Sequence, residues 1–153
     1  MSIVLPYMHK KEIWGRLFLK TRSDYVIILI RFLGLSKMQI EILEEILIPR
    51  GIVYKIKVEG KDLEILFLLH AVGRIKQWGL DVKMVLETLI LPDEVLIGHR
   101  NRFIAHKIYG EHLVRAIYEY QDEVPTLITV YFPYKGRYYQ GGKVYEDRIF
   151  KIC

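Results

Sequence analysis

Hydrophobic and polar residues alternate along the second half of the chain, in four segments separated by short polar connections. The segments cover residues 94–98, 102–109, 112–120 and 125–132. Alternation with a period of two residues is typical of strands with one buried face, and short connections join neighbouring strands in antiparallel order. The pattern predicts an antiparallel β-meander of four or more strands.

Two more strands and two helices are predicted in the middle of the chain. Residues 52–58 alternate, and residues 63–69 form a more continuously apolar strand. Residues 70–78 then have a helical pattern that stops at a glycine, and Asp81 is placed to cap a second helix over residues 82–91. We expect the helices to pack on one face of the antiparallel sheet, which is an α+β architecture.

The first 50 residues have a helical pattern instead. Asp24 is placed to cap one helix, and a capping-box pattern at residues 36–39 precedes a second. Apolar residues then recur with helical spacing at Ile40, Leu43, Ile46 and Leu47. We therefore expect a helical N-terminal extension over residues 1–50 and an α+β domain over residues 51–153. Two short helices followed by a hairpin also leave a DNA-reading winged helix open.

The composition is that of a basic globular protein. Hydrophobic residues make up 52% and charged residues 27% of the 153-residue chain, and the formal net charge is +5. This balance supports a packed core and permits a polyanionic partner. Cys153 is the single cysteine, and no apolar run resembles a signal peptide or a membrane span. We expect a cytoplasmic protein with no membrane partner, and the scarcity of asparagine beside many charged residues is typical of hyperthermophiles.

Residues 98–120 combine strand-like alternation with a concentration of cations. The basic residues are His99, Arg100, Arg102, His106, Lys107, His112 and Arg115. Arg115 falls in mid-strand between apolar residues, where an arginine needs either a carboxylate or a bound phosphate beside it. A salt bridge to Glu87 and a phosphate-binding role both remain open. The histidines match no metal-ligand spacing, so we expect no metal, and each is suited to act as a general base near neutral pH.

The tail that follows the last predicted strand is rich in tyrosine and in cations. Its sequence, YFPYKGRYYQGGKVY, includes Lys135, Arg137 and Tyr138. Aromatic rings interleaved with basic side chains suit stacking on unpaired bases beside a phosphate backbone. A tyrosine-rich contact between two copies of the chain is an equally good interpretation.

Residues 65–139 resemble a known family. The order of features is His70-Ala71-x-x-Arg74, a capped helix ending before Pro92-Asp93, and a last strand that reads Ile128-Thr129-Val130-Tyr131. This order resembles a family of small uncharacterised prokaryotic proteins that is similar in layout to the RelE and BrnT ribonuclease toxins. Those toxins place helices against an antiparallel sheet and usually lack an N-terminal half of the kind found here.

The resemblance implies metal-independent cleavage of RNA, in which the ribose 2′-hydroxyl attacks the neighbouring phosphate. The catalytic residues it implies are His70, Arg74, His106, Arg115 and Tyr131. It implies that Lys107 holds the phosphate together with Arg115, and the basic and aromatic pattern described above adds Arg100, Arg102, Lys135, Arg137 and Tyr138 as nucleic-acid-binding residues. The resemblance implies no cofactor. The partners it implies are RNA, with the ribosome as one context, and an antitoxin protein. A homodimer is left open. Two alternatives stay open beside the nuclease: a non-catalytic nucleic-acid-binding module, and a structural or interaction protein whose cations only solvate a sheet.

Overall fold

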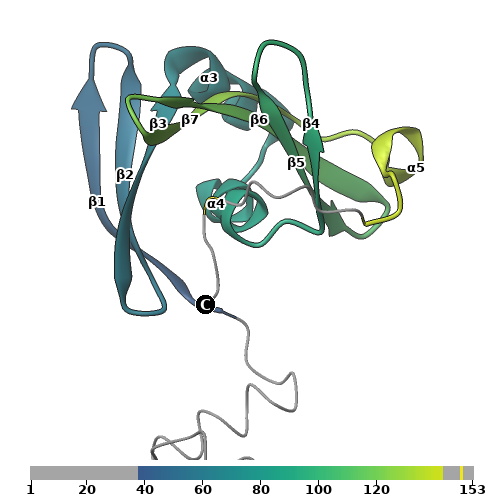
Figure 1. The fold of residues 1–153 in the computed structure, drawn as a ribbon, viewed down its shortest axis with the longest axis horizontal. Helices are drawn as coiled ribbons and strands as arrows, with labels where there is room; N and C mark the ends of the chain where they lie inside the picture. The colour runs from purple at the N-terminus through teal and green to yellow at the C-terminus, as the bar shows by residue number, and fades with distance from the viewer. Residues whose placement is uncertain (1–37, 143–148, 150–153) are drawn as a thin grey trace, which may run out of the picture. The chain divides into compact units, whose positions relative to one another are not determined.

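The computed structural model describes residues 38–142 and residue 149. The chain divides into two compact units, residues 1–38 and 39–153, and every element described below belongs to the second unit. The strands are β1 (Ile40–Ile48), β2 (Gly51–Val58), β3 (Lys61–Leu68), β4 (Glu94–Ile97), β5 (Phe103–Tyr109), β6 (His112–Gln121) and β7 (Val124–Tyr131). The helices are α3 (Leu69–Trp78), α4 (Val82–Ile90) and α5 (Lys135–Tyr138) (Figure 1).

The described strands form one seven-stranded sheet, in the order β1-β2-β3-β7-β6-β5-β4. The predicted antiparallel meander is confirmed as β4 to β7, and β1 to β3 form a second meander beside it. The two meanders meet where β3 pairs with β7 in parallel, with Leu66 beside Thr126 and Phe67 beside Leu127. The expectation of a purely antiparallel sheet is therefore wrong. The parallel pair arises because the chain leaves β3 through α3 and α4 and returns to the sheet at its far edge.

The predicted helical extension is wrong over its last part, because Ile40–Ile48 is the edge strand β1. Ile40 and Ile42 pair with Val58 and Ile56 of β2, and a turn at residues 49–50 joins the two strands. A β-bulge between Ile42 and Glu44 shifts the register. The bulge breaks the two-residue alternation, so the apolar spacing takes on a helical appearance in the sequence. The predicted helix after Asp24 lies outside the described residues.

Both helices predicted in the middle of the chain are confirmed to within one residue at each end, together with the predicted caps at Gly79 and Asp81. Gly79 ends α3 in the left-handed conformation, with φ of 64°, and its backbone N–H donates to carbonyls of the last turn. The side chain of Asp81 accepts a hydrogen bond from the backbone N–H of Lys83 at 3.0 Å and caps α4. These caps are local features, which is why the sequence pattern located them.

The two helices lie against opposite faces of the sheet, so the expectation that both pack on one face is wrong. The hydroxyl of Tyr109 donates to Glu87 of α4 at 2.8 Å, whereas the ring of Tyr131 lies under Arg74 of α3. The residues of β6 that pair with Tyr109 and with Tyr131 are three positions apart. Because successive side chains of a strand point to opposite faces, Tyr109 and Tyr131 lie on opposite faces of the sheet. We call these surfaces the α4 face and the α3 face; Figure 1 shows α4 within the curve of the sheet and α3 outside it.

The α4 face holds the main apolar core. Its fully buried side chains come from the helix and from both meanders: Val85, Leu86, Leu89, Ile56, Ile65, Phe67, Val114, Ala116 and Tyr118. Burying aliphatic and aromatic side chains of this size contributes roughly 1.5–3 kcal/mol each. Among the described residues, no helix is long and apolar enough to cross a membrane.

Candidate nucleic-acid interface

A buried carboxylate and a buried imidazole face one another on the α3 face. Glu94 and His106 are directly paired residues of β4 and β5, and both side chains are fully buried. His106 Nδ1 lies 2.6 Å from Glu94 Oε1. Burying a charged carboxylate is costly in free energy unless hydrogen bonds satisfy it. The stability of this buried pair therefore depends on which other groups donate to Glu94.

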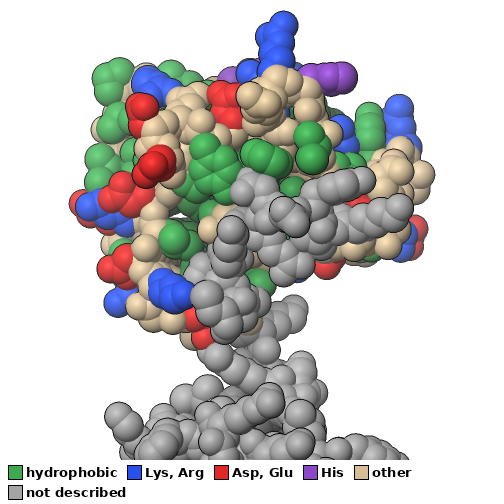
Figure 2. Space-filling model, viewed as in Figure 1, with side chains coloured by type: hydrophobic (Ala, Val, Ile, Leu, Met, Phe, Trp, Pro, Cys, Tyr) green, Lys and Arg blue, Asp and Glu red, His purple; other side chains and the backbone are tan. Residues whose placement is uncertain are grey.

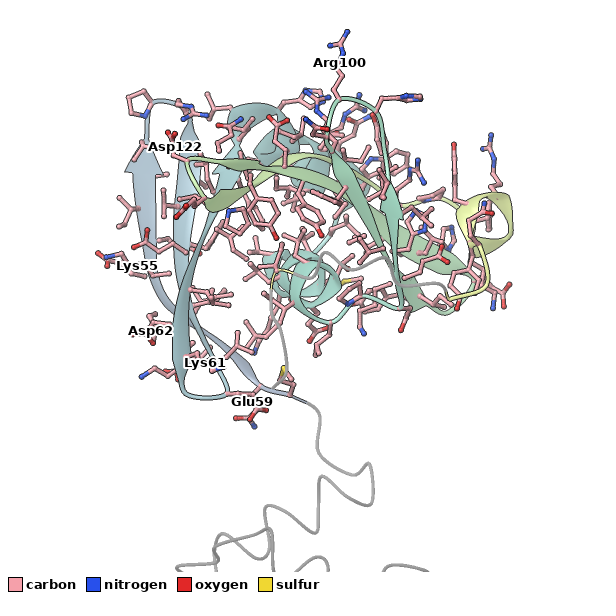
Figure 3. The ribbon with its side chains drawn as sticks, viewed as in Figure 1. Lys55, Glu59, Lys61, Asp62, Arg100 and Asp122 are labelled. Atoms are coloured by element: carbon pink, nitrogen blue, oxygen red, sulfur yellow. The ribbon has the colours of Figure 1, made fainter. Side chains whose placement is uncertain are left out.

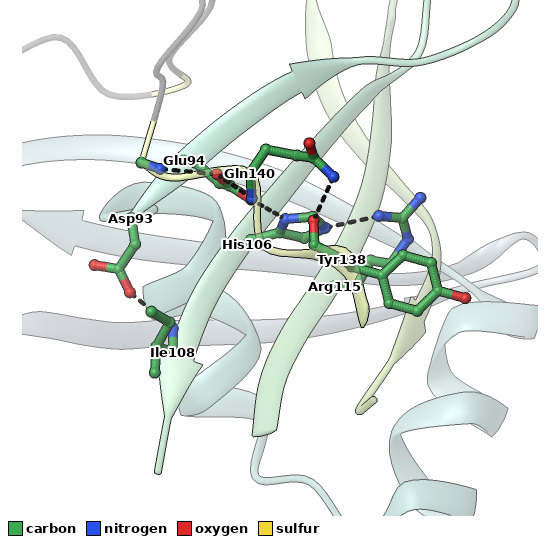
Figure 4. A network of polar contacts seen from close by, with 8 residues as sticks. Asp93, Glu94, His106, Ile108, Arg115, Tyr138 and Gln140 are labelled. Carbon is green, nitrogen blue, oxygen red and sulfur yellow. Dashed lines mark hydrogen bonds and ion pairs between the residues drawn. The ribbon is translucent and has the colours of Figure 1, made fainter. Parts of the chain in front are cut away.

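Backbone amides of the C-terminal segment supply the missing hydrogen bonds to Glu94. The N–H of Gln140 donates to both carboxylate oxygens at 2.9 and 3.0 Å, and the N–H of Gly142 donates to Oε2 at 3.1 Å. Figure 4 shows this segment crossing the strands above the carboxylate. Glu94 was not among the site residues predicted from the sequence. A single acid at the start of an otherwise apolar strand, Glu94-Val95-Leu96-Ile97, was the available signal.

The tautomer of His106 follows from its two partners. A guanidinium has only donors, so Arg115 Nη1, at 2.8 Å from His106 Nε2, must donate to that nitrogen. Nδ1 therefore carries the proton and donates a hydrogen bond to Glu94. Burial lowers the pKa of His106, and the positive charge of Arg115 lowers it further, while Glu94 opposes the shift. His106 is thus a neutral bridge between a carboxylate and an arginine, with both ring nitrogens engaged and no exposed surface.

Arg115 is half-buried and stacks on an aromatic ring. Its guanidinium carbon lies 4.5 Å from the centre of the Tyr138 ring in α5. Burial lowers the pKa of Arg115, and Tyr138, Tyr131 and Glu94 act in the opposite direction. The predicted alternative of a salt bridge from Arg115 to Glu87 is wrong, because Glu87 lies on the α4 face and accepts the Tyr109 hydroxyl.

A second arginine–tyrosine pair lies beside the first. Arg74 of α3 has its guanidinium carbon 5.5 Å from the centre of the Tyr131 ring. Tyr131 is the direct cross-strand neighbour of Arg115. We call Arg74, Tyr131, Arg115 and Tyr138 the arginine–tyrosine cluster. His70 is exposed and precedes Arg74 by one helical turn, so it projects from the same side of α3.

The other predicted nucleic-acid-binding residues are spread more widely. Arg137 is exposed on α5, 5.8 Å from the Tyr138 ring, and Lys135 begins the same helix. Arg102 contacts Glu119 at 3.4 Å. Arg100 is exposed at the tip of the connection between β4 and β5, where Figure 3 shows it pointing away from the strands.

Lys107 is not part of the arginine–tyrosine cluster, so the structure does not bring it beside Arg115 as the sequence predicted. It alternates with His106 along β5 and therefore points to the α4 face. Its ammonium group donates to the carbonyl of Leu91, just after α4, at 2.9 Å. Lys107 thus satisfies a carbonyl at a helix end, which is a structural role.

The cluster is suited to binding an anion beside a flat ring. A guanidinium offers a planar fork of donors that matches two phosphate oxygens, and tyrosine rings stack on unpaired bases. Comparisons of the chain with protein-family models, with curated proteins and with solved structures return no match. The resemblance to the RelE and BrnT toxins stays a prediction, and the function proposed below is argued from the geometry of the cluster.

Proposed function

We propose that the protein binds single-stranded RNA through the arginine–tyrosine cluster. One observation carries the proposal: two guanidinium groups lie over two tyrosine rings, on adjoining elements of one sheet face. Tyrosine rings accept bases by stacking, at about 1–3 kcal/mol per base, and arginine holds the phosphates between them. The net charge of +5 favours the approach of a polyanion.

Arg115 is the residue on which this binding depends most. Its fixed hydrogen bond to His106 and its stacking on Tyr138 limit the rotamers that it has to give up when a ligand binds. A pre-organised guanidinium loses little side-chain entropy on binding, so each phosphate contact adds more net affinity. Salt also screens a contact at a half-buried position less than it screens a contact at an exposed one.

The test is the affinity of the protein for labelled single-stranded RNA, measured over a range of salt concentrations. Arg115→Ala is expected to weaken binding at least tenfold and to reduce the salt slope by about 0.7, the value for one phosphate contact on a single strand. Lys107→Ala is the matched control, because it removes one charge from the opposite face of the neighbouring strand. Equal losses in the two variants would show that net charge alone, and not the cluster, binds RNA.

Metal-independent RNA cleavage is the second candidate function, favoured by the exposed His70 one helical turn from Arg74. In this reaction His70 takes the proton of the ribose 2′-hydroxyl, and the 2′-oxygen attacks phosphorus. The bond from phosphorus to the 5′-oxygen breaks, leaving a 2′,3′-cyclic phosphate, and the departing 5′-oxygen takes a proton from protonated His70 or from water to become a 5′-hydroxyl. Arg74 and Arg115 stabilise the charge on the phosphate, and Tyr131 donates to it or stacks.

Cleavage is tested by incubating the protein with end-labelled RNA in EDTA and identifying the product termini. We expect cyclic phosphate ends, and a loss of at least a hundredfold in rate with His70→Ala, the usual scale for a general base. His99→Ala, at another exposed histidine, is the control. If the unaltered protein leaves the RNA intact, cleavage is contradicted and the proposed RNA binding is unaffected.

A further inference from the structure

We infer that Glu94 is a positioning residue that holds both members of the Arg115–Tyr138 pair in place for the RNA ligand. This inference rests on the proposed RNA-binding function. Glu94 itself is fully buried and has no access to a ligand. It acts through two separate connections, one to the guanidinium and one to the ring.

The first connection runs through His106. Because Glu94 accepts the Nδ1 proton, His106 has to present an unprotonated Nε2, and that nitrogen accepts from Arg115 Nη1 at 2.8 Å. Loss of the carboxylate charge would remove one of the two partners that favour this tautomer and leave Arg115 alone to hold it. The imidazole could then carry its proton on Nε2, where it would repel the guanidinium.

The second connection runs through the backbone of the C-terminal segment. Glu94 accepts the N–H groups of Gln140 and Gly142, and Tyr138 precedes Gln140 by two residues. Gly142 has φ of 86°, and a Cβ added there would lie 3.0 Å from the hydroxyl of Tyr139, so the close approach suits glycine. Convergent backbone N–H groups of this kind form an anion-binding concavity, here filled by the protein's own carboxylate.

The two connections converge on one distance, the 4.5 Å between the Arg115 guanidinium and the Tyr138 ring centre. Arg115 is carried by a central strand of the sheet and Tyr138 by the short helix α5 after it. Without a common anchor, each would adjust its position independently. A fixed pair presents a phosphate-binding edge beside an aromatic surface, which is the combination that one nucleotide of a single strand requires.

The decisive comparison is Glu94→Gln against Asp93→Asn. Both changes remove one negative charge, at adjacent positions, but Asp93 is exposed and accepts only the backbone N–H of Ile108, at 2.7 Å, among the described residues. We expect Glu94→Gln to weaken binding of a labelled uridine oligonucleotide about tenfold, or about 1.4 kcal/mol. Asp93→Asn is expected to change the affinity less than twofold, and equal affinities in the two variants would overturn the inference.

A second readout separates positioning from a general loss of structure. In the unaltered protein, the hydrogen bond and the stacking should slow rotation of the Arg115 guanidinium and give resolved Nη signals in the nitrogen NMR spectrum. Glu94→Gln should average these signals while the backbone amide spectrum of the β-sheet stays folded. Resolved signals in the variant would contradict the inference even if the unaltered protein binds no RNA, so failure of the proposed function is distinguishable.

Two further variants test the two members of the pair without altering Glu94. His106→Gln removes the connection to Arg115, and Tyr138→Ala removes the ring. Each should weaken RNA binding severalfold. In a protein carrying both changes, Glu94→Gln should cause no additional loss, because it has nothing left to position. An additive tenfold loss in that background would show that Glu94 acts by another route.

Discussion

Two regions of one sheet carry cations in opposite kinds of surroundings. On the β1–β3 meander, Lys55 lies 3.7 Å from Glu44 and 3.8 Å from Glu64, and Lys57 lies 3.8 Å from Asp62. These side chains are exposed, and Figures 2 and 3 show both charge signs intermixed over the hairpins. In the arginine–tyrosine cluster the cations face rings and a neutral imidazole instead.

For anion binding, the groups that surround a cation therefore matter more than the number of cations on the surface. A lysine between two carboxylates has its charge balanced locally and attracts no further anion strongly. Rings and a neutral histidine hold a guanidinium in position without cancelling its charge. We therefore expect the cluster to attract an anion more strongly than the hairpin surface does.

The largest expected effect comes from removing the imidazole beneath the cluster. His106→Leu leaves Glu94 buried with one fewer donor, and breaking a buried charged network in this way costs about 3 kcal/mol or more of unfolding free energy. Chemical denaturation followed by circular dichroism measures it. A loss below about 1 kcal/mol would show that the backbone amides alone satisfy Glu94.

A smaller effect is expected when a lysine replaces Arg115, because the positive charge stays and the planar guanidinium is lost. Arg115→Lys should weaken RNA binding about tenfold, since an ammonium group neither stacks as well on Tyr138 nor pairs with two phosphate oxygens. Lys55→Arg on the hairpin should leave RNA affinity unchanged. Filter-binding titrations of both variants compare the regions directly, and a similar response in the two would remove the distinction.

The pH dependence of stability sharpens the comparison further. Burial holds the pKa of folded His106 below its ordinary value of 6.5, so the unfolded chain binds more protons in the window beneath that value. The contribution of neutral His106 is complete above about pH 6.5 and is lost as the pH falls toward the lowered pKa. Denaturation curves from pH 8 to pH 5 should show this loss, and it should be absent from His106→Gln. If both proteins lose the same stability between pH 8 and pH 5, groups other than His106 cause the sensitivity to acid.

The smallest effect is expected on the hairpin. Lys55→Ala removes two exposed ion pairs, and such pairs contribute less than about 1 kcal/mol to stability. RNA affinity should change less than twofold. Thermal unfolding and the same binding assay test both statements, and a large loss of RNA binding would extend the interface to the β1–β3 meander.

Several parts of the cluster were predictable because they depend on local patterns. Arg115 stood out as a cation in the middle of an apolar strand, and the helical pattern of residues 70–78 placed Arg74 on a helix one turn after His70, while the site roles of these two residues came from the family resemblance. Lys107 was predicted to hold a phosphate together with Arg115, although the alternation along β5 puts its side chain on the face opposite His106. Glu94 was missed because its partners, the amides of Gln140 and Gly142, lie more than 40 residues away and belong to the backbone, which no side-chain pattern reveals.

Local sequence patterns were enough to predict the β4–β7 meander, the two central helices and their caps, because periodicity and capping act over a few neighbouring residues. The tertiary structure alone decided that Ile40–Ile48 is a strand, since a bulge hid its alternation and pairing with β2 outweighed its helical spacing. It also decided the parallel contact of β3 with β7 and the placement of the helices on opposite faces. Those choices depend on which distant surfaces bury one another, and that free energy is summed over the whole fold.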